Sequence, residues 1–285
     1  TSALNVDGSA KIYANSVRLV DVVIDVDGDG GNVDGTTASE FYVEATTGNI
    51  DLAGTIRGNA DLTTATGSAL TKNNVTLVST AGSITNSSGS VIAIDQVNDL
   101  TLTANGSIGA SGAPVTVNAK KVSLTSNATT GTPDIYIENN PKVLTGSGAD
   151  VVELATVTTG TLQGNISYKQ TGKDLKITGG VISNGGNILI DPPVDVTVAA
   201  DIDAGSGNIT LQASNNIEFT TGDLITSGSG TILVQADSDS SGEGDLTFSN
   251  AGVSGTLAKV RTTGDGTIQL KGEHISLKDF SVKTD

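Results

Sequence analysis

The residues best suited to chemistry lie in two acidic segments, of which Asp25–Gly35 is the first. Its acids alternate with other residues in the order Asp-x-Asp-x-Asp-Gly. Alternate carboxylates can converge on one hard cation, and the glycine permits the sharp turn that a calcium loop needs. Position twelve, usually acidic, is Thr36 here, so Asp34 or Glu40 has to substitute. The segment predicts a Ca²⁺ site, with a solvated acidic turn as the alternative. The predicted ligands are Asp25, Asp27, Asp29 and Asp34.

The second acidic segment, Asp237–Asp245, opens with the same alternation but has serine at the fifth position and Phe248 at the twelfth. It predicts a second Ca²⁺ site, with a flexible polar loop as the alternative. Its candidate ligands are Asp237, Asp239, Ser241, Glu243 and Asp245.

Other residues give little support for catalysis. His274 is the only histidine, and the three arginines, Arg18, Arg57 and Arg261, are far apart in the sequence. Polysaccharide lyases and hydrolases need converging acids, or a base beside a calcium-bound carboxylate. We therefore expect no enzymatic activity and assign no catalytic residue.

The elements that must position the acidic segments follow a repeat. The tripeptide Gly-Asn-Ile recurs with its isoleucine at Ile166, Ile188 and Ile209, so the successive steps are 22 and 21. A period near 21, with a glycine turn and a short β-branched run, is typical of a solenoid in which each repeat forms one coil.

Apolar residues fall into three columns that share this period. The first column contains Ile166, Ile188, Ile209 and Ile232; the second contains Leu175, Val196, Ile217, Leu246 and Ile275; the third contains Leu162, Ile182, Ile202 and Ile225. Three columns with one period predict three short strands per coil, and therefore an all-β, three-faced parallel β-helix with about 20–23 residues per coil.

The period also predicts the domain organisation. We expect residues 1–285 to form a single β-helix segment of a larger protein, with corner insertions near 25–40 and 237–245 and an irregular stretch near 139–161. The chain begins with Thr1 and shows no basic-then-apolar leader, which we interpret as the sign of a piece of a longer or processed protein.

Polar residues also repeat. The corner asparagines Asn165, Asn187 and Asn208 fall one above another, so we expect their amides to hydrogen-bond along the stack, and we attribute the neighbouring glycines to turns that need positive φ. Before the second column, Asp174, Asp195 and Asp245 align, with Asn216 between them. Such stacked carboxylates either splay into solvent or are bridged by cations.

Composition restricts the partners. The net charge is −16, which disfavours nucleic-acid phosphates and anionic lipid surfaces because both would be repelled. No apolar stretch approaches the ~18 residues of a membrane span, so we predict no membrane insertion. Aromatic residues make up only 3%, which suits a narrow aliphatic core, and there is no cysteine.

The motifs resemble a known family. Gly-Asn-Ile-x-Leu, Asp-Leu-x-Leu, and Gly106–Ala110 followed by Pro114–Val117 resemble the stalk repeats of filamentous-haemagglutinin-like exoproteins, which are bacterial adhesins exported by two-partner secretion. The resemblance implies a right-handed β-helix, an extracellular or cell-surface location, and a role in cell adhesion, biofilm or fibre building. Its implied partners are host or neighbouring-cell surfaces, glycans or matrix.

We therefore predict a structural or adhesive stalk segment, with Ca²⁺ ordering its insertions and with end-to-end self-association through terminal strand edges. The alternative is a carbohydrate-binding or polysaccharide-cleaving β-helix, such as a phage tailspike or a pectate-lyase-like protein.

Overall fold

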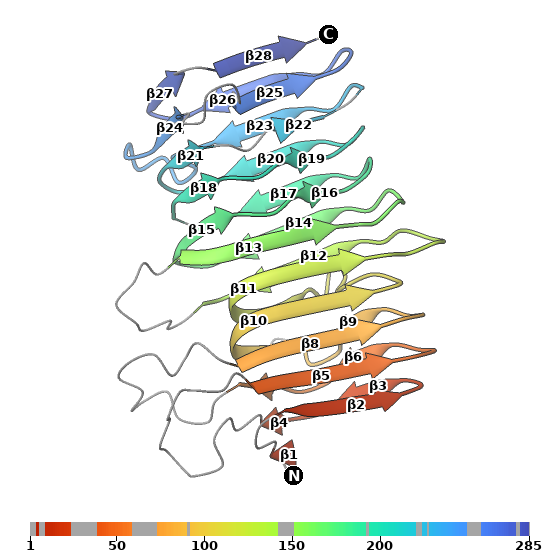
Figure 1. Ribbon diagram of the computed structural model, residues 1–285. Coiled ribbons are helices and arrows are strands. Elements are labelled where there is room, and N and C mark those ends of the chain that lie inside the picture. Colours follow the sequence, from red (N-terminus) through yellow and green to blue (C-terminus); the bar gives the residue numbers. More distant parts are fainter. Residues whose placement is uncertain are drawn as a thin grey trace. The chain divides into compact units, whose positions relative to one another are not determined.

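The computed structural model describes residues 4–5, 9–23, 39–58, 73–89, 92–141, 151–191, 194–220, 224–226, 228–249, 258–277 and 280–284. Within these residues the regular elements are all strands, and the strands pair in parallel. The chain divides into two compact units, Thr1–Asp150 and Val151–Asp285, each built of stacked coils. The predicted all-β, three-faced parallel β-helix is confirmed (Figure 1).

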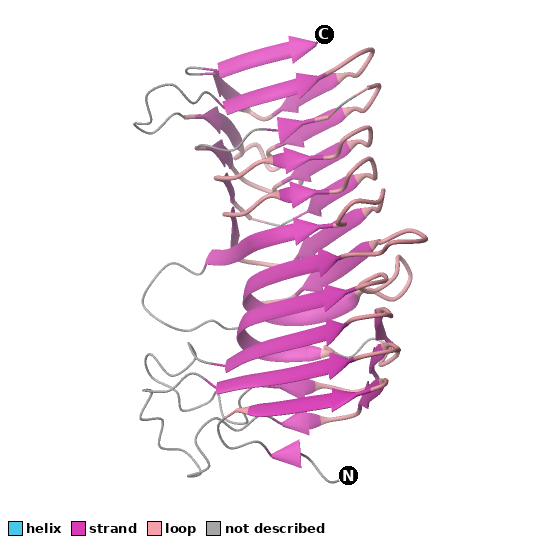
Figure 2. Ribbon diagram, turned by 45° about the vertical axis from the view of Figure 1, so that its right-hand side comes forward, coloured by secondary structure: helices cyan, strands magenta, loops and turns pink. Residues whose placement is uncertain are grey.

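The first face of the C-terminal unit consists of β14 (Ile166–Gln170), β17 (Ile188–Asp191), β20 (Ile209–Gln212), β23 (Ile232–Gln235) and β26 (Ile268–Lys271). The predicted first column is confirmed, because Ile166, Ile188, Ile209 and Ile232 are register partners in successive strands. All four side chains are buried. Figure 2 shows strands stacked in rows, with loops and turns between the rows.

The second face consists of the first half of β13 (Val151–Thr158), then β15 (Asp174–Ile177), β18 (Val196–Val198), β21 (Ile217–Phe219), β24 (Asp245–Phe248) and β27 (His274–Leu277). The predicted second column is confirmed through all five of its members. The rings of Phe219 and Phe248 stack inside, with centroids 4.5 Å apart.

The third face consists of the second half of β13, then β16 (Val181–Ile182), β19 (Ile202–Asp203), β22 (Leu224–Ile225), β25 (Ala258–Thr262) and β28 (Phe280–Thr284). The predicted third column is wrong at three positions. Its buried members are Val181, Ile202, Leu224 and Val260. Ile182 and Ile225 are one residue out of register, and Leu162 lies in the turn before β14.

The error has a physical reason. In β16 and β22 two apolar residues stand side by side, and a slip of one residue moves a side chain from the core to the outer face. The sequence does not show whether Val181 or Ile182 is the buried residue. The pairing of Val181 with Ile202 in β19 shows that it is Val181. Ile182 is accordingly 36% exposed.

The N-terminal unit is also built of three faces, and several of its coils are longer. Its first three coils hold β1 (Leu4–Asn5), β2 (Ala10–Ala14), β3 (Val17–Leu19), β4 (Val22–Val23), β5 (Ser39–Ala45), β6 (Ile50–Leu52), β7 (Ile56–Arg57), β8 (Asn73–Ser79) and β9 (Ile84–Asn86). Ile50 pairs in register with Ile84, so this coil is far longer than the predicted period, which does not hold there. The extra length lies in the connections that enter β5 and β8.

Two long strands of this unit serve two faces each. The start of β10 (Ile94–Ala104) pairs with β7, and its end pairs with β8. β11 (Val115–Ser126) follows β10 along both faces, and its first residues pair with β12 (Ile135–Asn139). The backbone therefore passes a corner of the coil without leaving the sheet.

The glycine of Gly-Asn-Ile has a different role from the predicted one. Gly186 and Gly207 do not have positive φ, and neither do the asparagines that follow them. A Cβ on Gly207 would instead clash with the carbonyl group of Gly186 in the previous coil. The motif needs glycine because successive backbones approach closely at this corner.

Ile209→Ala should lower the free energy of unfolding by about 2–5 kcal/mol, because Ile209 is 1% exposed between two other isoleucines of its column. Thr210→Ala, one residue along β20 and only half-buried, is the matched control and should change it by less than about 0.5 kcal/mol. Chemical denaturation measures both. An unchanged midpoint for Ile209→Ala would contradict its place in the core.

Candidate functional site

The first acidic segment cannot be placed. Asp25, Asp27, Asp29 and Asp34 all lie outside the described residues, so calcium binding there stays a prediction. Glu40, the possible substitute ligand, is described: its Oε2 lies 3.9 Å from Lys11 Nζ, and Thr76 Oγ1 donates to its Oε1 at 3.4 Å.

The second acidic segment joins β23 to β24, and its carboxylates accept hydrogen bonds from within the segment. Ser241 Oγ and the Gly242 amide both donate to Asp237 Oδ1, at 3.1 and 3.0 Å, and the Ser241 amide donates to Asp239 Oδ1 at 3.2 Å. Asp237, Ser240 and Gly242 have positive φ, which gives the loop its tight curvature. The structure therefore brings together three of the five predicted ligands, Asp237, Asp239 and Ser241.

The other two predicted ligands are not part of that group. Glu243 is exposed, and Asp245 is engaged elsewhere, because its Oδ1 lies 3.0 Å from Nδ1 of His274. In the described part of the chain no three acidic or histidine side chains form a group that could hold a metal ion. Calcium at Asp237–Asp245 stays a prediction that would depend on serine and backbone oxygens as well as carboxylates.

The asparagines of Gly-Asn-Ile form a ladder along the first face. The amide nitrogen of Asn187 donates to Asn165 Oδ1 at 3.1 Å, that of Asn208 to Asn187 Oδ1 at 3.0 Å, and that of Thr231 to Asn208 Oδ1 at 2.7 Å. The predicted hydrogen bonding along the stack is thus confirmed. Each side chain satisfies a backbone donor of the following coil, so these asparagines stabilise the turn.

The stacked acids form a second ladder of the same kind. Asp195 Oδ1 accepts the backbone and side-chain N–H groups of Asn216, at 3.0 and 3.1 Å, and Asn216 Oδ1 accepts the backbone N–H of Asp245 at 2.9 Å. Asp174 Oδ1 lies 3.4 Å from the Asp195 nitrogen. Sequence reasoning weighed only solvent and bridging cations. It missed the backbone donors because register decides whether a carboxylate meets one.

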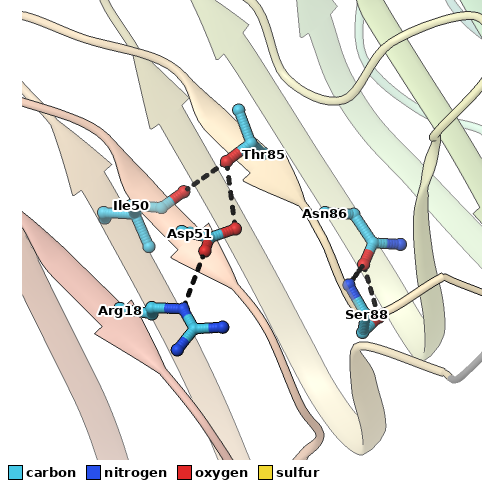
Figure 3. A network of polar contacts seen from close by, with 6 residues as sticks. All are labelled: Arg18, Ile50, Asp51, Thr85, Asn86 and Ser88. Carbon is cyan, nitrogen blue, oxygen red and sulfur yellow. Dashed lines mark hydrogen bonds and ion pairs between the residues drawn. The ribbon is translucent and has the colours of Figure 1, made fainter.

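Outward side chains also pair across strands in the N-terminal unit (Figure 3). Nε of Arg18 in β3 donates to Asp51 Oδ2 in β6 at 3.2 Å, and Thr85 Oγ1 in β9 donates to Asp51 Oδ1 at 3.3 Å. Asn86 Oδ1 accepts the Ser88 amide at 3.1 Å. Arg18, Asp51 and Thr85 therefore form a polar chain across the outer face of β3, β6 and β9, and the contact between the buried Asn86 and Ser88 is separate from it.

A small aromatic surface lies over β2 and β5. Tyr13 is 63% exposed, and its ring centroid is 5.7 Å from that of Tyr42. Lys11 Nζ lies 5.5 Å from the Tyr42 centroid, and the Tyr42 hydroxyl donates to Glu44 Oε2 at 2.8 Å. Sequence reasoning missed this pair because it relied on a period near 21, whereas the register partners Lys11 and Tyr42 are separated by one of the longer coils of this unit.

Glu44 controls the ionisation of Tyr42. The hydrogen bond to Glu44, with desolvation and the negative charge of Glu44, raises the pKa of Tyr42 from 10.0 to about 12. A raised folded-state pKa means that this contribution to stability is fully present below pH 10 and is lost as the pH rises to about 12.

Asp195→Ala should lower the free energy of unfolding by about 1–2 kcal/mol, because two N–H groups of Asn216 lose their acceptor. Asp195→Asn keeps an acceptor oxygen and should cost less than about 0.5 kcal/mol. Chemical denaturation of both variants measures the difference. Equal losses would instead indicate that the negative charge, and hence a bridging cation, is what matters.

The ultraviolet absorbance of phenolate should show one of the four tyrosines titrating near pH 12. Tyr42→Phe should remove that step and so identify it. Glu44→Ala should move it back towards the ordinary value of 10.0, because the acceptor and its charge are gone. An unmoved step in Glu44→Ala would show that the hydrogen bond does not set this pKa.

Comparisons with known proteins add no assignment. No protein-family model matches the sequence, and neither a curated protein nor a solved structure shows significant similarity to it. Among the described residues, no helix is long and apolar enough to cross a bilayer.

Proposed function

We propose that the chain is a non-catalytic, structural or adhesive stalk segment of a bacterial surface fibre or exoprotein, located outside the cell. The observation that carries this proposal is the use of polar and acidic side chains to join one coil to the next. The resemblance of the repeats to filamentous-haemagglutinin-like stalks points the same way.

The junction between two coils of the C-terminal unit illustrates the argument. Three sets of strand pairings join the coil of β17–β19 to that of β20–β22, and Asn187 and Asp195 each add a side-chain bond across the junction. Each coil depends mainly on its neighbours, as in other solenoids. Such a stack transmits load along its axis and holds its corner loops at fixed spacing.

The corner loops are the parts of such a stalk that meet partners. Residues 239–243 of the β23–β24 loop are exposed. The partners that we propose are host or neighbouring-cell surfaces, glycans or matrix, because the net charge of −16 disfavours nucleic acid and anionic lipid. Calcium belongs to this proposal as the ion that orders the segments Asp25–Gly35 and Asp237–Asp245.

End-to-end association is a further part of the proposal. Ile275 and Leu277 occupy second-column positions above Leu246 and Phe248, yet they are 43% and 53% exposed. A following coil, whether of this protein or of another copy, would bury them and pair the edge of β27. A sedimentation coefficient that rises with protein concentration, and no longer does so in Leu277→Lys, is the expected signature.

The alternative is a carbohydrate-binding or polysaccharide-cleaving surface, and one observation favours it. Tyr13 and Tyr42, with Glu40 and Glu44 beside them, combine aromatic faces with hydrogen-bonding carboxylates on an outer face. Sugars are bound by side chains of these kinds, because their C–H faces pack on rings and their hydroxyl groups donate to acids.

Beads that carry the chain should adhere to surfaces coated with cell-surface glycans or matrix proteins. In a parallel assay, polysaccharides incubated with the chain should show no increase in reducing ends, the product of chain cleavage. Tyr13→Ala should leave adhesion unchanged, as should Tyr136→Ala, the matched control on β12. Loss of adhesion in Tyr13→Ala alone would favour the carbohydrate-binding alternative. Shortened polysaccharide would overturn the non-catalytic assignment, and absence of adhesion to every surface would overturn the adhesive role.

A further inference from the structure

Two asparagines of the chain, Asn105 and Asn184, are followed directly by a glycine. In this dipeptide the side chain of asparagine reacts readily with the backbone, because glycine has no side chain to shield its amide nitrogen. That nitrogen attacks Cγ, the carbonyl carbon of the asparagine side chain. Whether the reaction proceeds in the folded chain therefore depends on what the glycine N–H contacts, and the two sites differ in this respect.

At Asn105 the nitrogen is held by the coil stack. The Gly106 N–H donates to the carbonyl oxygen of Gly82 in the preceding coil at 2.8 Å, and the Ser107 N–H donates to Ser83 Oγ at 3.1 Å. Asn105 and Gly106 are both half-buried. A nitrogen in such a bond loses its proton reluctantly and cannot turn towards Cγ, so the fold protects Asn105.

At Asn184 the nitrogen is available. Asn184 is exposed in the turn between β16 and β17, with a φ of 51°, and Gly185 follows with a φ of 116°. The Gly186 N–H closes this turn on the carbonyl oxygen of Ser183 at 3.3 Å. The Gly185 N–H, by contrast, has no hydrogen bond within the described part of the chain.

The corner also explains why an asparagine stands there. Counting on from the pairings of β16 with β13 and β19, Asn184 occupies the position of Gly160 and Gly205, which both have positive φ. Asparagine is one of the few residues that tolerate this conformation. Its Nδ2 donates to the carbonyl oxygen of Gly160. That bond uses only Nδ2, and each time it opens, Cγ can turn towards the Gly185 nitrogen.

We propose that Asn184 is a site of spontaneous deamidation. The Gly185 nitrogen forms a bond to Cγ of Asn184, the bond from Cγ to Nδ2 breaks, and ammonia leaves with the proton that the Gly185 nitrogen gives up. One water molecule then opens the cyclic imide to aspartate or isoaspartate. In isoaspartate the backbone continues through the former side chain. The reaction needs water but no enzyme, metal or oxidant.

Both products change the corner. Each loses the Nδ2 donor and leaves the carbonyl oxygen of Gly160 without this partner. Isoaspartate also lengthens the backbone where coils approach closely, because a Cβ on Gly205 would already lie 2.8 Å from the Gly185 nitrogen. The conversion thus adds a negative charge and loosens the turn between β16 and β17 as the protein ages.

The test is to age the full chain at mildly alkaline pH and to follow both asparagines by peptide mapping with mass spectrometry. Isoaspartate is counted separately with an isoaspartyl methyltransferase and S-adenosylmethionine. The Asn184 peptide should gain one mass unit and isoaspartate several-fold faster than the Asn105 peptide. In the chain unfolded by urea the two rates should converge, because both asparagines precede glycine and only the fold distinguishes them.

Two variants separate the reaction from its consequence. Asn184→Gly should remove the isoaspartate signal and keep the fold, because glycine occupies this position in the neighbouring coils. Asn184→Asp introduces one of the products and should unfold at a lower temperature than fresh wild type, as aged wild type should.

Three results would overturn the proposal. Conversion of Asn105 as fast as that of Asn184 in the folded chain would show that the free Gly185 N–H does not select the site. An unmodified Asn184 after a time that converts the unfolded chain would show that its bond to Gly160 protects it. Unchanged unfolding of both Asn184→Asp and the aged wild type would remove the proposed loosening of the corner.

Discussion

Parallel backbone pairing between successive coils is the interaction on which the other features of each unit depend. Two neighbouring coils are held about 4.8 Å apart by these bonds, so side chains that are register partners lie one over the other. That spacing makes isoleucine stack on isoleucine inside, and it brings each asparagine oxygen within reach of the next amide nitrogen. It also excludes a Cβ at Gly207, where the carbonyl of Gly186 occupies the space.

The same constraint explains how this chain tolerates acidic residues in a column. Isolated carboxylates stacked at coil spacing repel one another. Here Asp195 accepts two N–H groups of Asn216, and the neutral Asn216 separates it from Asp245. One backbone and one side-chain N–H of the following coil thus compensate the charge of Asp195 locally. The strongly negative composition is therefore compatible with tight stacking.

Much of the architecture could be predicted from the sequence, and the limits are physical. The first two columns were predictable because each β-branched or aliphatic member directly follows a polar residue at a regular spacing. The third was not, because Val181 and Ile182 are both apolar and only pairing selects one. The pairing of Tyr13 with the β5 residues, and the burial of Asn118 at a bulge, depend on registers set by inserted segments. Periodicity therefore predicts the coil. Contacts whose register is set by an insertion or a bulge can be found only from the structure.

The asparagine ladder has a direction. Every Oδ1 accepts from the coil that follows it in sequence, so acceptors point towards one end of the stack and donors towards the other. The two terminal surfaces of such a stack are therefore chemically different. Copies that join one of these surfaces to the other meet head to tail, and a heterologous contact of this kind produces open filaments when its rotation does not close a ring.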